Sequence, residues 1–168
     1  YQVAPSAIAR VIVKTFAEAT RLAFPHPRTS EEAQFSLPYP VAAALVLGRF
    51  GPGEVQDDNL DNAAVLDLSS RVEMVAEQRF QEEFPAKALA DVEVVTRDGR
   101  RLRSGPVQAA GDADDPLPEA ELEAKFYEFC TPFLPAEDIQ RLREFALGCD
   151  DLPTIQPFLD ILRRVRGR

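Results

Sequence analysis

The sequence contains 168 residues, of which 45% are hydrophobic and 28% are charged, as is typical of a globular chain with one domain, or one domain and an appendage. Its net charge of −9 argues against nucleic acid and anionic membrane surfaces as partners, because both are bound through Lys and Arg. No apolar run approaches the roughly 20 residues that span a bilayer, and no signal peptide is recognisable. Two cysteines make no disulfide framework, so we expect a cytoplasmic protein in which Cys130 and Cys149 are reduced and buried.

The first predicted element is a strand over Ile8–Phe16, where β-branched residues are frequent and partly alternate. One face of this strand carries Val11, Val13 and Thr15. The segment Ala17–Phe24 contains helix formers and predicts a short helix. Pro25–Pro27 then imposes an extended connection that contains His26, the one histidine of the sequence. We interpret His26 as a solvent-facing loop residue, although a loop histidine could still reach a site.

The stretch Glu31–Phe50 carries several helix signals in succession. Thr29, followed three residues later by Glu32, forms a capping box that starts a short helical turn. Ser36 is placed to cap a second helix, whose first turn contains two prolines where amide hydrogens have no helical partner. The alanine-rich apolar run that follows ends at Gly48, a residue suited to the position just past a helix end.

Two elements and a connection follow the glycine-rich break at residues 51–53. Asn59 is predicted to cap a helix over Leu60–Ser69, which carries apolar residues on one face. The pattern of Val72–Ala76 predicts a strand. The segment Phe80–Lys87 is interpreted as a polar connection.

A hairpin is the clearest local signal in the sequence. The strand-like runs 92–96 and 101–107 flank Asp98-Gly99. This dipeptide favours a type I′ turn, in which both central residues need positive φ. Gly105-Pro106 predicts a kink or an edge position for the second strand.

The composition changes near residue 117, where the linker-like segment Asp112–Pro118 ends. Apolar spacing after it predicts three helices, over Glu119–Thr131, Ala136–Leu147 and Thr154–Val165. We therefore predict an α+β fold, with a small antiparallel-sheet domain and packed helices over residues 1–117 and a C-terminal helical segment over residues 118–168.

The sequence lacks most patterns that carry chemistry. It offers no His and Cys pairs at zinc-binding spacing and no glycine-rich phosphate loop. The acidic residues at 112, 114 and 115 could bind a hard cation weakly but lack the alternation and terminal Glu of a calcium loop. We predict no metal site.

Tyr39 is the candidate that remains, because it lies at the start of an apolar helix between two prolines that fix its backbone. A buried phenol needs a hydrogen-bond partner, which makes a core tyrosine one interpretation. A helix N-terminus also presents free amide donors suited to a carboxylate, which makes a ligand contact the other interpretation.

In the runs EEAQFSLPY (31–39) and VAAALVLG (41–48) the chain resembles the C-terminal part of the MmgE/PrpD family, which includes 2-methylcitrate dehydratase, cis-aconitate decarboxylase and iminodisuccinate epimerase. The resemblance extends in order over residues 8–165. Further matches are Pro27 with Thr29, Val94 with the hairpin Arg97–Arg100, Gly111, Pro116-Leu117 and Lys125-Phe126.

The resemblance implies a two-domain enzyme in which a small α+β domain is inserted into a large helical domain, with the active site in the cleft between them. Residues 118–168 would then belong to the all-helical domain. The N-terminal helical domain would lie outside this chain, which begins with Tyr1 close to its first strand and so looks cut from a longer protein, unless only a short leader is absent. The resemblance also implies a homodimer and no metal or organic cofactor.

The implied chemistry removes or shifts a proton next to a carboxylate of a small di- or tricarboxylic acid, by dehydration, decarboxylation or epimerisation. Only Tyr39 matches a cleft position of the family and is carried over as catalytic, with Ser36 and Gln34 as neighbouring substrate-binding residues. The Asp, His and Lys site residues of the family would lie upstream, so we expect this chain alone to be inactive. The alternative is a non-catalytic interaction or ligand-sensing α+β module.

Overall fold

The computed structural model describes residues 3–151 and 153–165, and the chain divides into two compact units, unit 1 (Tyr1–Ala109) and unit 2 (Ala110–Arg168). Unit 1 contains a four-stranded sheet with helices, and three α-helices are described in unit 2. The predicted α+β class is therefore confirmed. The two units part at Ala109, a little before the boundary near residue 117 that the sequence predicts.

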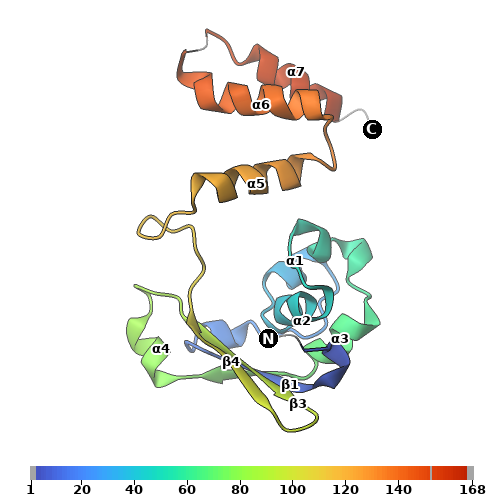
Figure 1. Ribbon diagram of the computed structural model, residues 1–168, viewed down its shortest axis with the longest axis vertical. Helices are drawn as coiled ribbons and strands as arrows, with labels where there is room; N and C mark the ends of the chain where they lie inside the picture. The colour runs from blue at the N-terminus through green and yellow to red at the C-terminus, as the bar shows by residue number, and fades with distance from the viewer. Residues whose placement is uncertain (1–2, 152, 166–168) are drawn as a thin grey trace. The chain divides into compact units, whose positions relative to one another are not determined.

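The sheet of unit 1 has the strand order β2-β1-β3-β4 (Figure 1). Its strands are β1 (Ile8–Thr15), β2 (Val72–Ala76), β3 (Ala90–Thr96) and β4 (Arg101–Val107). β3 pairs antiparallel with both β1 and β4, whereas β2 pairs parallel with β1. The prediction of an antiparallel sheet is thus wrong for β2. The chain crosses back over the sheet through three helices before it enters β2, and such a crossover returns a strand in the same direction.

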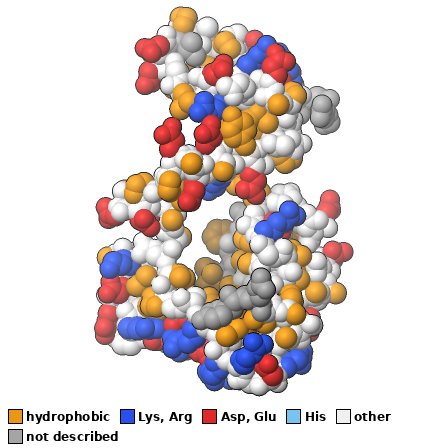
Figure 2. All heavy atoms as spheres, in the orientation of Figure 1, with side chains coloured by type: hydrophobic (Ala, Val, Ile, Leu, Met, Phe, Trp, Pro, Cys, Tyr) orange, Lys and Arg blue, Asp and Glu red, His pale blue; other side chains and the backbone are white. Residues whose placement is uncertain are grey.

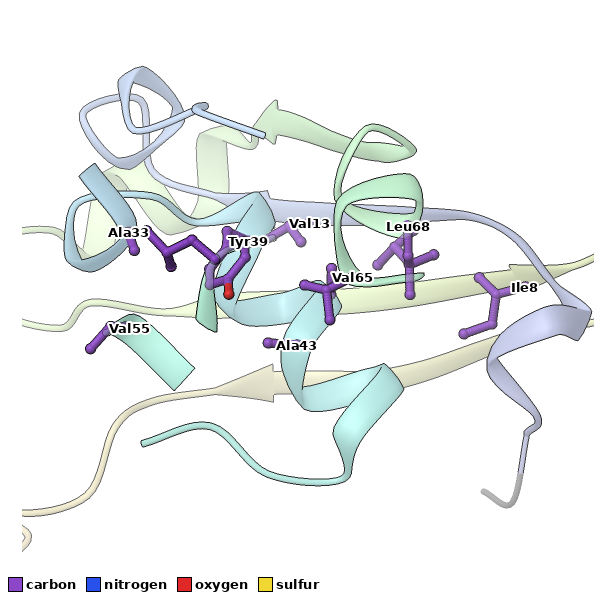
Figure 3. Packing of buried hydrophobic residues seen from close by; sticks show 11 residues of the cluster. Ile8, Val13, Ala33, Tyr39, Ala43, Val55, Val65 and Leu68 are labelled. Atoms are coloured by element: carbon purple, nitrogen blue, oxygen red, sulfur yellow. The ribbon is translucent and has the colours of Figure 1, made fainter. Parts of the chain in front are cut away.

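Three helices lie on one side of this sheet (Figure 1). They are α1 (Ser30–Gln34), α2 (Pro38–Leu47) and α3 (Ala63–Ser69). The face of β1 that carries Val11 and Val13 is buried, with Val11 at 0% and Val13 at 3% exposure. Figure 3 shows Val13, Val65 and Leu68 gathered in the core. Burial of each such side chain contributes roughly 1.5–3 kcal/mol, so this layer is the main source of stability in unit 1.

Several local signals act as the sequence predicts. The Thr29 hydroxyl accepts the Glu32 amide N–H at 3.2 Å, although the Glu32 carboxylate bonds the Arg28 amide instead of closing the box on Thr29. Gly48 ends α2 with a φ of 74°. The segment 17–24 contains only a 3₁₀ turn, Ala19–Arg21, in place of the predicted helix.

Three further expectations need correction. The cap of α3 is Asn62, not Asn59, because the Asn62 side chain accepts the amides of Ala64 and Val65. The segment predicted as a polar connection contains the short helix α4 (Gln78–Glu83). The 96–101 hairpin forms, but Gly99 alone has positive φ in its turn, so the turn is not type I′.

The three predicted helices of unit 2 are confirmed as α5 (Glu119–Cys130), α6 (Ala136–Gly148) and α7 (Gln156–Val165). All 12 residues of α5 are described, and none is buried. Hydrophobic side chains lie on the surface of this unit (Figure 2), among them Leu122, Phe129, Phe133, Leu147, Ile155 and Leu162. Cys130 is half-buried and Cys149 is exposed, so the expected burial of the cysteines is wrong for Cys149.

Candidate functional site

The N-terminus of α2 is built by Ser36, which is 3% exposed. Its hydroxyl accepts the amide N–H of Tyr39 at 3.1 Å and donates to the carbonyl of Phe24 at 2.6 Å. Leu37 occupies the cap position of α2, and Ser36, one residue earlier, makes the hydrogen bond to the first turn that the sequence predicts. Both hydrogen-bonding directions of this hydroxyl are used inside unit 1, which fixes the backbone from which the Tyr39 side chain starts.

The Tyr39 side chain points into unit 1, where the residue is 1% exposed (Figure 3). Its hydroxyl donates to the carbonyl of Glu54 at 3.0 Å, and the carbonyl of Asn59 lies 3.4 Å away as a second acceptor. A phenol has one proton to donate, and two main-chain carbonyls compete for it here. The lone pairs of the hydroxyl oxygen can still accept a hydrogen bond from a ligand.

Burial raises the pKa of Tyr39 above its ordinary value, and the negative charges of Glu54 and Asp61 raise it further. The phenol is consequently neutral at physiological pH. A neutral phenol can donate or relay a proton, but it is not a general base.

A pocket of about 270 Å³ is bordered by Tyr39 and by Glu54 and Asn59, the two residues whose carbonyls face its hydroxyl. It is lined by Tyr39, Leu47, Arg49, Gly53, Glu54, Asn59, Asp61 and Asn62. All of these residues belong to α2 or to the segment that connects α2 with α3, so unit 1 forms the pocket without help from unit 2.

Glu54 organises the wall of this pocket. One oxygen of its carboxylate, Oε2, accepts the amide N–H of Gly51 at 2.9 Å. The other, Oε1, lies 2.8 Å from Nε of Arg49, while the Glu54 side chain itself is only 10% exposed. The pocket thus combines a neutral phenol, a guanidinium paired with Glu54 and a further acidic group, Asp61, in one small space.

The three predicted site residues lie in three different environments. Tyr39 borders the pocket, Ser36 is buried beneath the helix N-terminus, and Gln34 is exposed at the end of α1. Neither Ser36 nor Gln34 is among the residues that line the pocket. Their assignment as substrate-binding residues stays a prediction, as does the catalytic role of Tyr39.

The sequence did not identify Arg49, Asn59 or Asp61 as residues of a candidate site. The available signal was the Gly-Pro-Gly break at 51–53, which turns the chain back toward the start of α2. His26 makes a hydrogen bond of 2.6 Å with the exposed hydroxyl of Ser70 and does not border this pocket.

Within residues 3–151 and 153–165, no three His, Cys, Asp or Glu side chains come together in a way that could hold a metal ion. Of the helices that the structure describes, none has both the length and the apolar composition needed to cross a membrane.

Comparison with known families gives one match. The family model for the MmgE/PrpD C-terminal domain matches residues 1–151. This range includes the whole of unit 1 and, in unit 2, α5 and α6. No curated protein matches the chain.

Proposed function

Because the chain belongs to the MmgE/PrpD family, we propose that it forms the small-domain part of an enzyme that acts on small di- or tricarboxylic acids. The reaction removes or shifts a proton next to a carboxylate, by dehydration, decarboxylation or epimerisation. The observation that carries the proposal is the pocket in unit 1, where Tyr39 and Arg49 line the same small space.

The pocket supplies only part of this chemistry. Proton removal next to a carboxylate needs a general base and positive charge to stabilise the developing enolate. Tyr39 is neutral, and its neighbours Glu54 and Asp61 disfavour its deprotonation. Tyr39 is therefore proposed as a hydrogen-bond donor or proton relay that turns its one proton from the Glu54 carbonyl to the substrate, and the base comes from residues outside this pocket.

Unit 2 supports the presence of a further helical domain. Leu122, Phe133 and Leu147 are 53%, 63% and 70% exposed, and burial of such side chains against another surface is favourable. We therefore include in the proposal that α5–α7 pack against a helical domain that also carries the base. A homodimer of the complete enzyme is part of the same proposal.

The test is turnover by the enzyme that contains this chain in its natural sequence context. 2-Methylcitrate, cis-aconitate and iminodisuccinate are offered in turn to the wild type and to Tyr39→Phe. We expect one substrate to be consumed and kcat/KM to fall by about tenfold or more in Tyr39→Phe, because a positioned proton donor is lost. Tyr127→Phe, which removes an exposed hydroxyl of α5, is the matched control. Equal kcat/KM in wild type and Tyr39→Phe would remove Tyr39 from the mechanism.

The exposed apolar side chains of unit 2 also favour a second candidate, a non-catalytic module that binds a protein partner. Turnover discriminates between the two. If the enzyme in its natural context consumes none of the three acids, and the chain instead sediments as a complex with a partner protein, the module is the better account.

A further inference from the structure

The pocket beside Tyr39 contains one cation, Arg49, among the eight residues that line it. Gly48 ends α2 with positive φ, so the chain turns at this point and Arg49 lies outside the helix. Its side chain is 79% exposed, yet Glu54 fixes its Nε edge. An exposed arginine that is anchored at one edge keeps its other edge for a second partner.

The geometry leaves the outer edge of this guanidinium available. Arginine has five N–H donors in a planar fork, and the Nε edge of Arg49 faces Glu54 Oε1 at 2.8 Å. Within the described part of the chain, Glu54 is the only carboxylate that pairs with Arg49. The two terminal nitrogens match the spacing of a carboxylate, which arginine binds through two parallel hydrogen bonds.

We propose that Arg49 binds one carboxylate group of a small organic acid in this pocket. The choice of a carboxylate rests on the proposed function, and the binding residue goes beyond it. Glu54 acts as a positioning residue: its carboxylate orients the guanidinium, and its carbonyl holds the Tyr39 hydroxyl.

The charges in the pocket limit the ligand to one carboxylate at this position. The charge of Glu54 is offset by Arg49 and by the Gly51 amide, whereas Asp61, which lines the same space, has no cation partner within the described part of the chain. The second carboxylate of a diacid would be repelled by Asp61 inside the pocket, so it has to extend out of the pocket into solvent. At about 270 Å³ the pocket is smaller than the clefts that hold drug-sized ligands, which suits a small acid.

The experiment titrates the full 168-residue chain with succinate and measures binding by calorimetry and amide chemical shifts. We expect saturable binding at one site, with shifts at residues 49–54. In Arg49→Gln binding is expected to weaken by about tenfold or more. Arg49→Lys keeps the charge but loses the fork, so we expect a loss of about threefold to tenfold. Arg28→Gln is the matched control, because Arg28 also pairs with a carboxylate, that of Glu32, but lies outside the pocket.

The proposal is overturned if the wild type shows no saturable binding, if Arg28→Gln weakens binding as much as Arg49→Gln, or if Arg49→Lys binds succinate like the wild type. Circular dichroism checks that each variant is folded. Failure of this binding test can be told apart from failure of the turnover test, because succinate binding needs neither a base nor a second domain. Binding that depends on Arg49 together with unchanged turnover in Tyr39→Phe would retain the carboxylate site and reject the catalytic role of Tyr39.

Discussion

The hydroxyl of Tyr39 donates a hydrogen bond to the main-chain carbonyl of Glu54 at 3.0 Å, across 15 residues of sequence. The carboxylate of the same Glu54 contacts Arg49. The phenol and the guanidinium are thus held by two ends of one residue. A shift of the turn Pro52–Val55 would move both groups together, so the connection between α2 and α3 controls the geometry of the candidate site.

Tyr39→Phe is expected to destabilise unit 1. The substitution removes the donor from the buried carbonyl of Glu54, and a buried polar group without a partner costs about 1–3 kcal/mol. Urea unfolding of the isolated chain measures the change. Tyr127→Phe serves as the control, since its hydroxyl bonds the exposed side chain of Gln140 and its loss should change stability by less than about 0.5 kcal/mol. Equal stability of Tyr39→Phe and wild type would show that the Tyr39–Glu54 bond contributes nothing.

The pKa of Tyr39 is expected to fall toward its ordinary value in Asp61→Asn. Burial is the largest cause of the raised pKa and persists in the variant, so the return is partial. The ultraviolet absorbance of tyrosinate, as the difference between chains with and without Tyr39→Phe, isolates this one of the three tyrosines. An unchanged Tyr39 titration in Asp61→Asn would show that Asp61 does not act on the phenol.

The same pKa shift predicts alkaline behaviour. The folded-state pKa of Tyr39 lies above its unfolded value, so its contribution is fully present below the unfolded pKa and is lost as pH rises through the folded pKa. Stability should therefore decline less steeply with alkaline pH in Tyr39→Phe than in the wild type. Unfolding free energies measured across that range check the sign.

Local interactions explain which parts of the fold the sequence could predict. The alternation in β1, the Thr29 cap and the Gly48 helix end depend on residues a few positions apart. The parallel pairing of β2 with β1 depends on how helices far along the chain cross the sheet, which no local pattern encodes. The fold class followed from the order of elements, whereas the sheet topology did not.

The wrongly predicted cap and turn involve side chains that can form more than one local hydrogen bond. Asn59 and Asn62 are both suited to start a helix, but the Asn59 amide donates to the carbonyl of Gly53 at 2.7 Å and so joins the pocket wall. Asp98 bonds Thr96 and Arg100 within the hairpin, which holds Asp98 without positive φ.

The sequence predicted only part of the candidate site. Tyr39 stood out because two prolines flank it, but its partner Glu54 is 15 residues away. Arg49 follows a helix-ending glycine and carries no motif of its own. Its place beside Tyr39 depends on the turn at 51–55, so only the folded chain brings the two residues to one pocket.

Asp57 is expected to make the stability of unit 1 sensitive to acid. Its Oδ1 accepts both the hydroxyl of Ser30 at 2.6 Å and the amide N–H of Ser30 at 2.5 Å. These hydrogen bonds, the hydroxyl first, lower the pKa of Asp57. A depressed folded-state pKa contributes stability that is present above the unfolded pKa, about 3.9, and is lost as pH falls through the folded value.

Asp57→Asn should therefore be less stable at neutral pH and lose less stability on acidification than the wild type. Unfolding at a series of acidic pH values measures both effects. Asp58→Asn changes the same charge one residue away and is the control. Parallel acid profiles for wild type and Asp57→Asn would show that the Ser30 contact has no energetic consequence.

Hydrogen exchange should separate the two units. The amides of β1 lie in the centre of the sheet beside buried Val11 and Val13, and we expect them to exchange only on global unfolding. No residue of α5 is buried, so its amides should open with free energies near zero. Exchange of the full chain followed by mass spectrometry provides the comparison.

Protection of α5 equal to that of β1 would mean that the helices of unit 2 are stable without packing against another domain. That result would remove the main support for a further helical domain. Weak protection of α5 that rises when the chain is measured in its natural sequence context would instead favour α5–α7 as helices completed by another domain.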